Sequence, residues 1–70
     1  MTWAELYRLT SHRGLDTLAL RARAAVLTSG RITLRRKMDD VKDNLRLLCF
    51  TLDAQHVPVT QEDESAVLGS

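Results

Sequence analysis

Apolar residues recur along the chain at helical spacing, and the first such segment begins close to the start. Thr2-Trp3-Ala4-Glu5 has the capping-box pattern, so we expect a helix to begin at Trp3. Gly14 could end this helix or lie inside a longer one, at a cost of about 1 kcal/mol relative to Ala. The apolar side of this first segment would carry Trp3, Leu6, Tyr7 and Leu9.

From Leu15 to Leu27 the chain consists of helix-forming residues without glycine or proline. Gly30 follows them and predicts the C-terminal end of the helix. An apolar stripe at spacings of three and four residues is formed by Leu15, Leu18, Ala22 and Ala25.

The most regular pattern comes after Gly30 and predicts a second helix from about Arg31 or Thr33 to about His56. Its apolar residues alternate steps of four and three, which is a heptad seam of about three heptads. The seam residues are Leu34, Met38, Val41, Leu45, Leu48 and Leu52. Leu47, Phe50 and Ala54 form a second apolar patch on another side of this helix. Because two apolar faces need two neighbours, we expect one to be the first helical segment and the other a second chain.

Pro58 should end the second helix, because the residue before a proline disfavours helical backbone. The polar, acidic residues 59–70 are typical of a disordered tail. The sequence therefore predicts an all-α fold. Residues 1–57 would form a helical hairpin with a long second helix, assembled into a homodimeric helix bundle, and residues 58–70 would be a disordered acidic tail.

The size of the chain favours oligomerisation as the source of stability. Seventy residues make at most one domain, and small scaffolds usually need disulfides, a metal or a partner. Cys49 is the single cysteine, so no disulfide can form within the chain. One Cys with His12 and His56 does not make a four-ligand zinc set, and we expect no metal and no cofactor.

The hydropathy pattern predicts a protein of the cytoplasm with no membrane partner. No stretch reaches the roughly 18 apolar residues of a membrane span. The first residues, Met1–Glu5, lack the basic start and apolar core of a signal peptide.

The net charge of +1 hides a strong asymmetry. Residues 1–37 carry eight Arg or Lys against two acids, a balance of +6, whereas residues 38–70 carry two against seven, a balance of −5. On a helical wheel, one flank of the seam is a basic row about 22 Å long. This row consists of Arg31, Arg35, Lys42 and Arg46. Further basic residues that could contact a polyanion are Arg36, Lys37, Arg21 and Arg23.

Two interpretations of the basic row stay open. It could be a solvated helix face whose long side chains cover the edge of the seam. It could instead follow the phosphates of a nucleic-acid duplex, binding by charge and shape without reading the sequence.

The titratable residues give no catalytic arrangement. His12 suits a solvated loop, and His56 near a helix C-terminus suits the helix dipole. Cys49 could be activated by nearby Arg46, but a buried apolar role is commoner. We expect no enzyme.

The stretch from Val41 to His56 resembles the second helix of the nodavirus RNA-silencing suppressors. The resemblance rests on Val41, Leu45, Arg46, Cys49, Leu52, Gln55 and His56 in one ungapped frame. It implies an antiparallel dimer that lies along double-stranded RNA, with Lys42 and Arg46 facing phosphates. The chain departs from the family at Asp43, where the family tends to be basic, and at Pro58, where the family's helix continues.

These observations predict two alternative functions. The first is a non-catalytic, sequence-independent binder of double-stranded RNA that suppresses RNA silencing. The second is a small protein-interaction module, of the phage- or secretion-encoded inhibitor or co-chaperone kind, that docks a helical hairpin onto a partner protein. The second apolar patch with Leu47 and Phe50 favours this alternative, as does a pI of about 8.0, below that of most nucleic-acid-binding domains.

Overall fold

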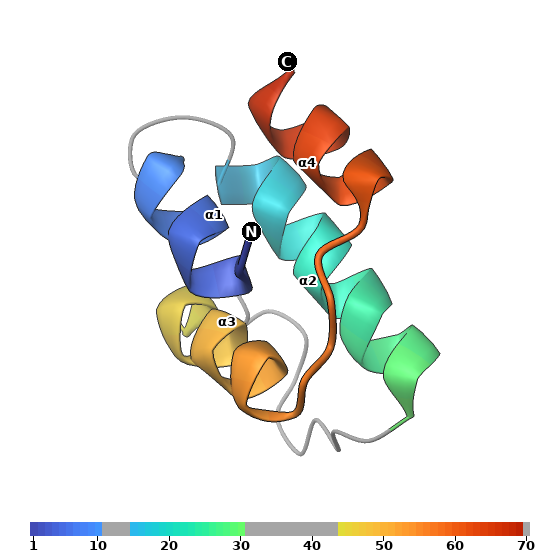
Figure 1. The fold of residues 1–70 in the computed structure, drawn as a ribbon. Coiled ribbons are helices and arrows are strands. Elements are labelled where there is room, and N and C mark those ends of the chain that lie inside the picture. The colour runs from blue at the N-terminus through green and yellow to red at the C-terminus, as the bar shows by residue number, and fades with distance from the viewer. Residues whose placement is uncertain (11–14, 31–43, 70) are drawn as a thin grey trace.

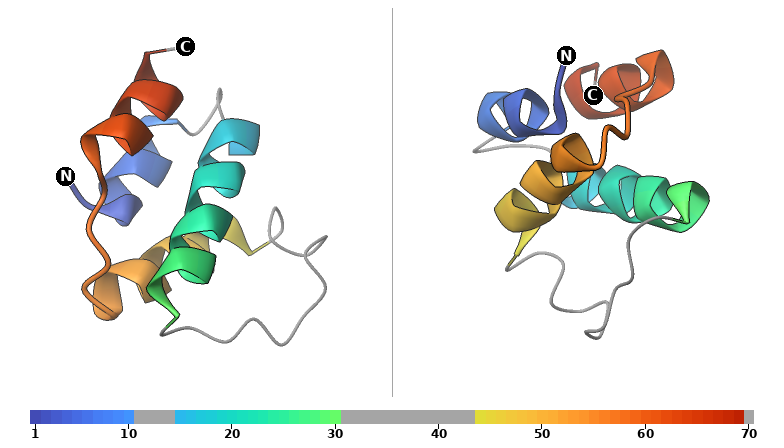
Figure 2. Two further views of the ribbon diagram at one scale, coloured as in Figure 1. Left: turned by 90° about the vertical axis from the view of Figure 1, so that its right-hand side faces the viewer. Right: turned by 60° about the horizontal axis from the view of Figure 1, so that its bottom comes forward.

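The computed structural model describes residues 1–10, 15–30 and 44–69, and these form four helices (Figure 1). The helices are α1 (Trp3–Leu9), α2 (Leu15–Ser29), α3 (Leu45–Ala54) and α4 (Gln61–Leu68). No strand occurs in these three ranges, so the all-α prediction is confirmed. Helix α2 is the longest, and α4 packs along it while α1 packs mainly against α3 (Figures 1 and 2).

Helix α1 begins at Trp3, as the capping-box pattern predicts. The Glu5 backbone N–H donates to Thr2 Oγ1 at 3.0 Å, and the Thr2 N–H donates to Glu5 Oε1 at 3.2 Å. The helix ends at Leu9, and Thr10 is its C-cap with non-helical backbone angles. The helix is therefore not continuous into α2, although residues 11–14 themselves lie outside the described part of the chain.

Helix α2 ends where the glycine predicts. Its last residue is Ser29, and Gly30 adopts a left-handed backbone with φ of 65°. That conformation costs glycine little because it has no Cβ.

The expectation of one unbroken second helix is wrong, since the helix that carries Leu45, Leu48 and Leu52 begins only at Leu45. Asn44 is the N-cap, with φ of −116° and ψ of 22°, and its backbone is not helical. Its side chain makes no capping hydrogen bond. The part of the predicted helix over residues 31–43 lies outside the described residues.

Helix α3 ends at Ala54, two residues before the predicted end, because the backbone reverses at His56. The His56 N–H donates to the Asp53 carbonyl and the Val57 N–H donates to the Leu52 carbonyl, each at 3.0 Å. His56 has φ of 58°, so this is a Schellman motif with a histidine in the left-handed position.

The prediction of a disordered tail beyond Pro58 is wrong. Residues Gln61–Leu68 form α4, which begins with a second capping box between Thr60 and Asp63. Three acids in its first turn suit the positive end of the helix dipole. The composition alone suggested that this acidic segment is disordered. Its acids instead favour the start of a helix.

All four helices contribute to one core. Its buried residues are Trp3, Leu6, Leu18, Ala19, Ala22, Val26, Leu45, Leu48, Cys49, Leu52 and Val67. The predicted stripe on α2 is confirmed at Leu18 and Ala22, whereas Leu15 is exposed. On α1, Trp3 and Leu6 are buried but Leu9 is exposed. A four-helix core replaces the expected two-helix hairpin because α4 covers α2.

Candidate partner-binding groove

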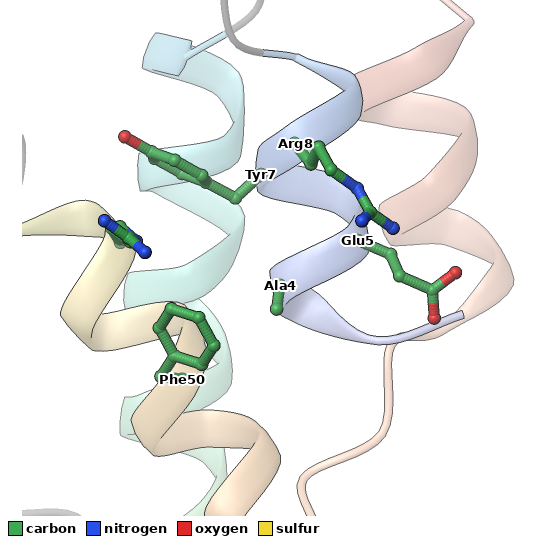
Figure 3. Close-up of a pocket in the computed structure, with 6 residues that line it drawn as sticks. Ala4, Glu5, Tyr7, Arg8 and Phe50 are labelled. Carbon is green, nitrogen blue, oxygen red and sulfur yellow. The ribbon is translucent and has the colours of Figure 1, made fainter.

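Helices α1 and α3 border a surface groove of about 490 Å³. It is lined by Ala4, Glu5, Tyr7, Arg8, Arg46 and Phe50. Figure 3 shows the Tyr7 side chain extending from α1 to the side where α3 lies, the Phe50 ring on α3, and Ala4 on the first turn of α1. The Arg8 and Glu5 side chains extend on the other side of α1, away from Phe50. Each helix therefore contributes one aromatic ring to the groove, and the charged lining residues are Glu5 and Arg8 on α1 and Arg46 on α3.

The position of α1 beside α3 is fixed by Asp53. Its Oδ1 accepts the backbone N–H of Trp3 at 2.8 Å, and its Oδ2 accepts that of Ala4 at 3.0 Å. These are two of the donors that a helix start leaves without an intrahelical partner. The indole N–H of Trp3 also donates to the Val57 carbonyl at 3.0 Å. Three hydrogen bonds from distant parts of the chain thus hold a helix of seven residues, too short to be stable alone.

Arg46 and Phe50 form the α3 wall of the groove. The Arg46 Cζ atom lies 5.6 Å from the centroid of the Phe50 ring, within cation–π distance. They are four residues apart on one helix, the spacing at which side chains meet. Arg46 is exposed, and the Phe50 side chain is 49% exposed.

Leu47 extends the apolar surface of α3 beyond the groove. It is 65% exposed and lies three residues before Phe50, so both project from one side of the helix. Ala54 is exposed on the same helix. The second apolar patch predicted for this helix thus faces outward, while the core-facing side carries Leu45, Leu48 and Leu52, as predicted for the seam.

Three of the residues predicted to bind nucleic acid lie in the described part of the chain, on α2 and α3. Arg46 is exposed at the groove, but Arg21 Nε donates to Asp63 Oδ1 at 2.8 Å, and Arg21 Nη2 lies 3.9 Å from Glu62. Arg23 is half-buried on α2. The other five predicted contacts lie outside the described residues: Arg31, Arg35, Arg36, Lys37 and Lys42. The basic row therefore stays a prediction, with Arg46 its one described member, and the ion pairs of Arg21 commit that residue to α4.

The predicted packing residues divide in a similar way. Leu45, Leu48 and Leu52 are buried inside this chain, so they are not available as the seam of a dimer. Leu34, Met38 and Val41 lie outside the described residues. A contact between two copies would have to use other surfaces of the described helices.

Cys49 is buried in the core and does not line the groove. Burial, together with the negative charge of Asp53, raises the pKa of its thiol from 9.0 to about 12. The thiol is therefore protonated at neutral pH, in keeping with a core role and not a reactive one.

No group of three or more metal-binding side chains gathers in the described part of the chain. None of the helices found there is long and apolar enough to span a membrane.

A second hollow of about 450 Å³ lies between α2 and the 56–60 connection. The Arg21–Asp63 pair and the side of His56 border it. Because Arg21 already forms ion pairs with Asp63 and Glu62, we do not propose a binding role for this hollow.

The sequence identified Phe50, Leu47 and Arg46 as surface residues, but it did not identify Ala4, Tyr7 and Arg8 as their neighbours. Tyr7 had been placed with the core-facing residues of α1, where it is only half-buried. A residue at the edge of an apolar stripe can line a groove, but the sequence does not say which helix forms the other wall.

Comparison with known proteins adds no relative. The chain matches no protein family, no curated protein and no solved structure.

Proposed function

We propose that this chain is a non-catalytic binding protein that docks onto another protein through the outward side of α3 and the adjoining groove. The observation that carries the proposal is the exposure of Leu47 and Phe50, at 65% and 49%, next to the groove. Large apolar side chains grouped on a surface and bordered by polar ones are typical of protein interaction sites. Phe50 and Arg46 line the groove from α3, and both residue types are enriched at protein interfaces.

The modest charge of the chain supports a protein partner over a polyanion. The whole chain carries a net charge of +1 and has a pI of about 8.0. Nucleic-acid-binding domains usually have a pI above about 9.

The test compares the unmodified chain with a Leu47→Glu, Phe50→Glu variant as bait in cells of its natural source. We expect the unmodified chain to retain at least one protein that the variant loses, while circular dichroism shows equal helicity. Equal helicity is expected because both side chains are exposed. The same set of proteins on both baits would contradict the proposal.

Binding of double-stranded RNA is the second candidate function, and the exposure of Arg46 supports it. Arg46 belongs to the predicted basic row, whose other members lie in residues 31–42. Gel shifts with duplex RNA, duplex DNA and single strands test this candidate. Binding should weaken steeply with salt, and Arg46→Ala and Lys42→Ala should weaken it for all sequences alike. An absence of duplex binding at low salt would remove this candidate and its role in suppressing RNA silencing.

A homodimer in the cytoplasm remains part of the proposal for either function. The small size of the chain and the outward apolar side of α3 support self-association. Sedimentation at micromolar concentration tests it, and a stable monomer would show that the four-helix core suffices alone.

A further inference from the structure

We propose that the groove between α1 and α3 recognises a short protein segment carrying an aromatic side chain next to a carboxylate. This inference rests on the proposed function and specifies the partner's chemistry at the docking surface. Its ring would pack against Phe50, Tyr7 and Ala4, and its carboxylate would bind Arg46.

The carboxylate preference follows from the position of Arg46. Its side chain is exposed and lines the groove, and its Cζ atom lies 5.6 Å from the centroid of the Phe50 ring. A guanidinium carries N–H donors in a planar fork that matches a carboxylate.

The aromatic preference follows from the surface beneath that fork. Phe50 is half exposed, Tyr7 is half-buried, and Ala4 leaves space between the two helices. Aromatic rings favour offset or edge-to-face contacts with one another, and two rings, one from each helix, offer a partner ring both. The volume of about 490 Å³ lies within the range of small-ligand pockets and suits one or two side chains.

The charge of the groove lining favours one carboxylate over a chain of phosphates. Arg8 and Arg46 oppose Glu5 there, so the lining carries a net charge of +1. A short segment with one acid and one ring matches that charge, whereas a nucleic-acid strand would bring several phosphates to it.

The experiment titrates the full, isotopically labelled chain with three blocked dipeptides and follows its backbone amide signals by NMR. The probes are N-acetyl-aspartyl-phenylalanine amide, its asparaginyl counterpart without the charge, and N-acetyl-aspartyl-alanine amide without the ring. We expect the first to shift the signals of Ala4, Tyr7, Arg46 and Phe50 and to bind about tenfold more tightly than either control. A tenfold difference corresponds to 1.4 kcal/mol.

Variants separate the two parts of the recognition. Arg46→Gln should abolish the preference for Asp over Asn, and Phe50→Ala should abolish the preference for Phe over Ala. Arg23→Gln on α2 is the matched control, since it removes an arginine outside the groove and should leave both preferences unchanged. Both groove residues are exposed, so helicity should be unchanged.

Three results would overturn the inference. One is equal binding of all three dipeptides, and another is a shift pattern centred away from the groove. The third is tighter binding of a uridine tetranucleotide to the same residues, which would assign the groove to nucleic acid. If the dipeptides fail while the Leu47→Glu, Phe50→Glu bait still loses a partner, the inference falls and the proposed function stands. If that bait loses nothing, the proposed function itself falls.

Discussion

Asp53 Oδ1 accepts the backbone N–H of Trp3 at 2.8 Å, although fifty residues separate them in the sequence. The carboxylate also accepts the N–H of Ala4, so one side chain of α3 caps the first turn of α1. A negative charge at this position interacts favourably with the helix dipole as well. The position of α1, which forms one wall of the groove, therefore depends on these hydrogen bonds to Asp53 of α3.

We expect Asp53→Ala to lower the free energy of unfolding by about 2–4 kcal/mol, because two partly buried N–H groups lose a charged acceptor. Urea denaturation followed by circular dichroism measures this. Ala54→Ser, an exposed change on the same helix, is the control and should stay within about 0.5 kcal/mol. Equal midpoints for the two variants would show that Asp53 does not hold α1.

The docking of α4 gives a second prediction, because this helix replaces the disordered tail expected for residues 58–70. Val67 is buried in the core and its neighbour Leu68 is 43% exposed. Val67→Ala should cost about 1–3 kcal/mol, and Leu68→Ala much less. Thermal unfolding of the pair measures the difference. If both variants have the same melting temperature as the unmodified chain, α4 does not contribute to the stability of the core.

Local signals predicted the parts of the fold that depend on neighbouring residues. Thr2 and Glu5 identify the start of α1, and Gly30 marks the end of α2, because capping is decided within a few residues. Leu48 and Leu52 are buried as the heptad spacing indicates.

The rest of the fold depends on contacts between distant residues. Thr60 and Asp63 carry the same capping pattern as the start of α1, but the acidic composition around them suggested disorder. That helix joins the fold through Val67 in the core and through the ion pair from Asp63 to Arg21, 42 residues away. The same holds for the groove. The wheel of α3 placed Phe50 outward, but the long-range bonds from Asp53 and Val57 to the start of α1 bring Tyr7 into the same groove.

The buried thiol predicts a loss of stability at alkaline pH. In the unfolded chain Cys49 ionises with a pKa near 9.0, whereas in the folded chain the pKa is about 12. Between these values the unfolded state releases a proton that the folded state keeps, so the free energy of unfolding falls as the pH rises. The loss should reach about 2 kcal/mol by pH 10.5.

The measurement is the difference between the unmodified chain and Cys49→Ala at each pH, because other groups titrate in both proteins. The difference should be constant below pH 8 and should shift in favour of Cys49→Ala above pH 9. A difference that stays constant to pH 11 would mean that the thiol ionises equally in both states.

The left-handed backbone at His56 gives the last prediction. Its φ of 58° costs a residue with a Cβ roughly 1 kcal/mol, and glycine avoids that cost. The Schellman hydrogen bonds use backbone atoms, from His56 to Asp53 and from Val57 to Leu52, so they survive the loss of the side chain. His56→Gly should therefore raise the free energy of unfolding by up to about 0.6 kcal/mol, which is the roughly 1 kcal/mol of relieved strain less about 0.4–1 kcal/mol for the greater entropy of glycine in the unfolded chain. Gln55→Gly, one residue earlier where φ is −88°, gains no such relief and should be destabilising. Urea midpoints that move in opposite directions for these adjacent substitutions are the expected result, and a loss of stability in both would show that His56 carries no backbone strain.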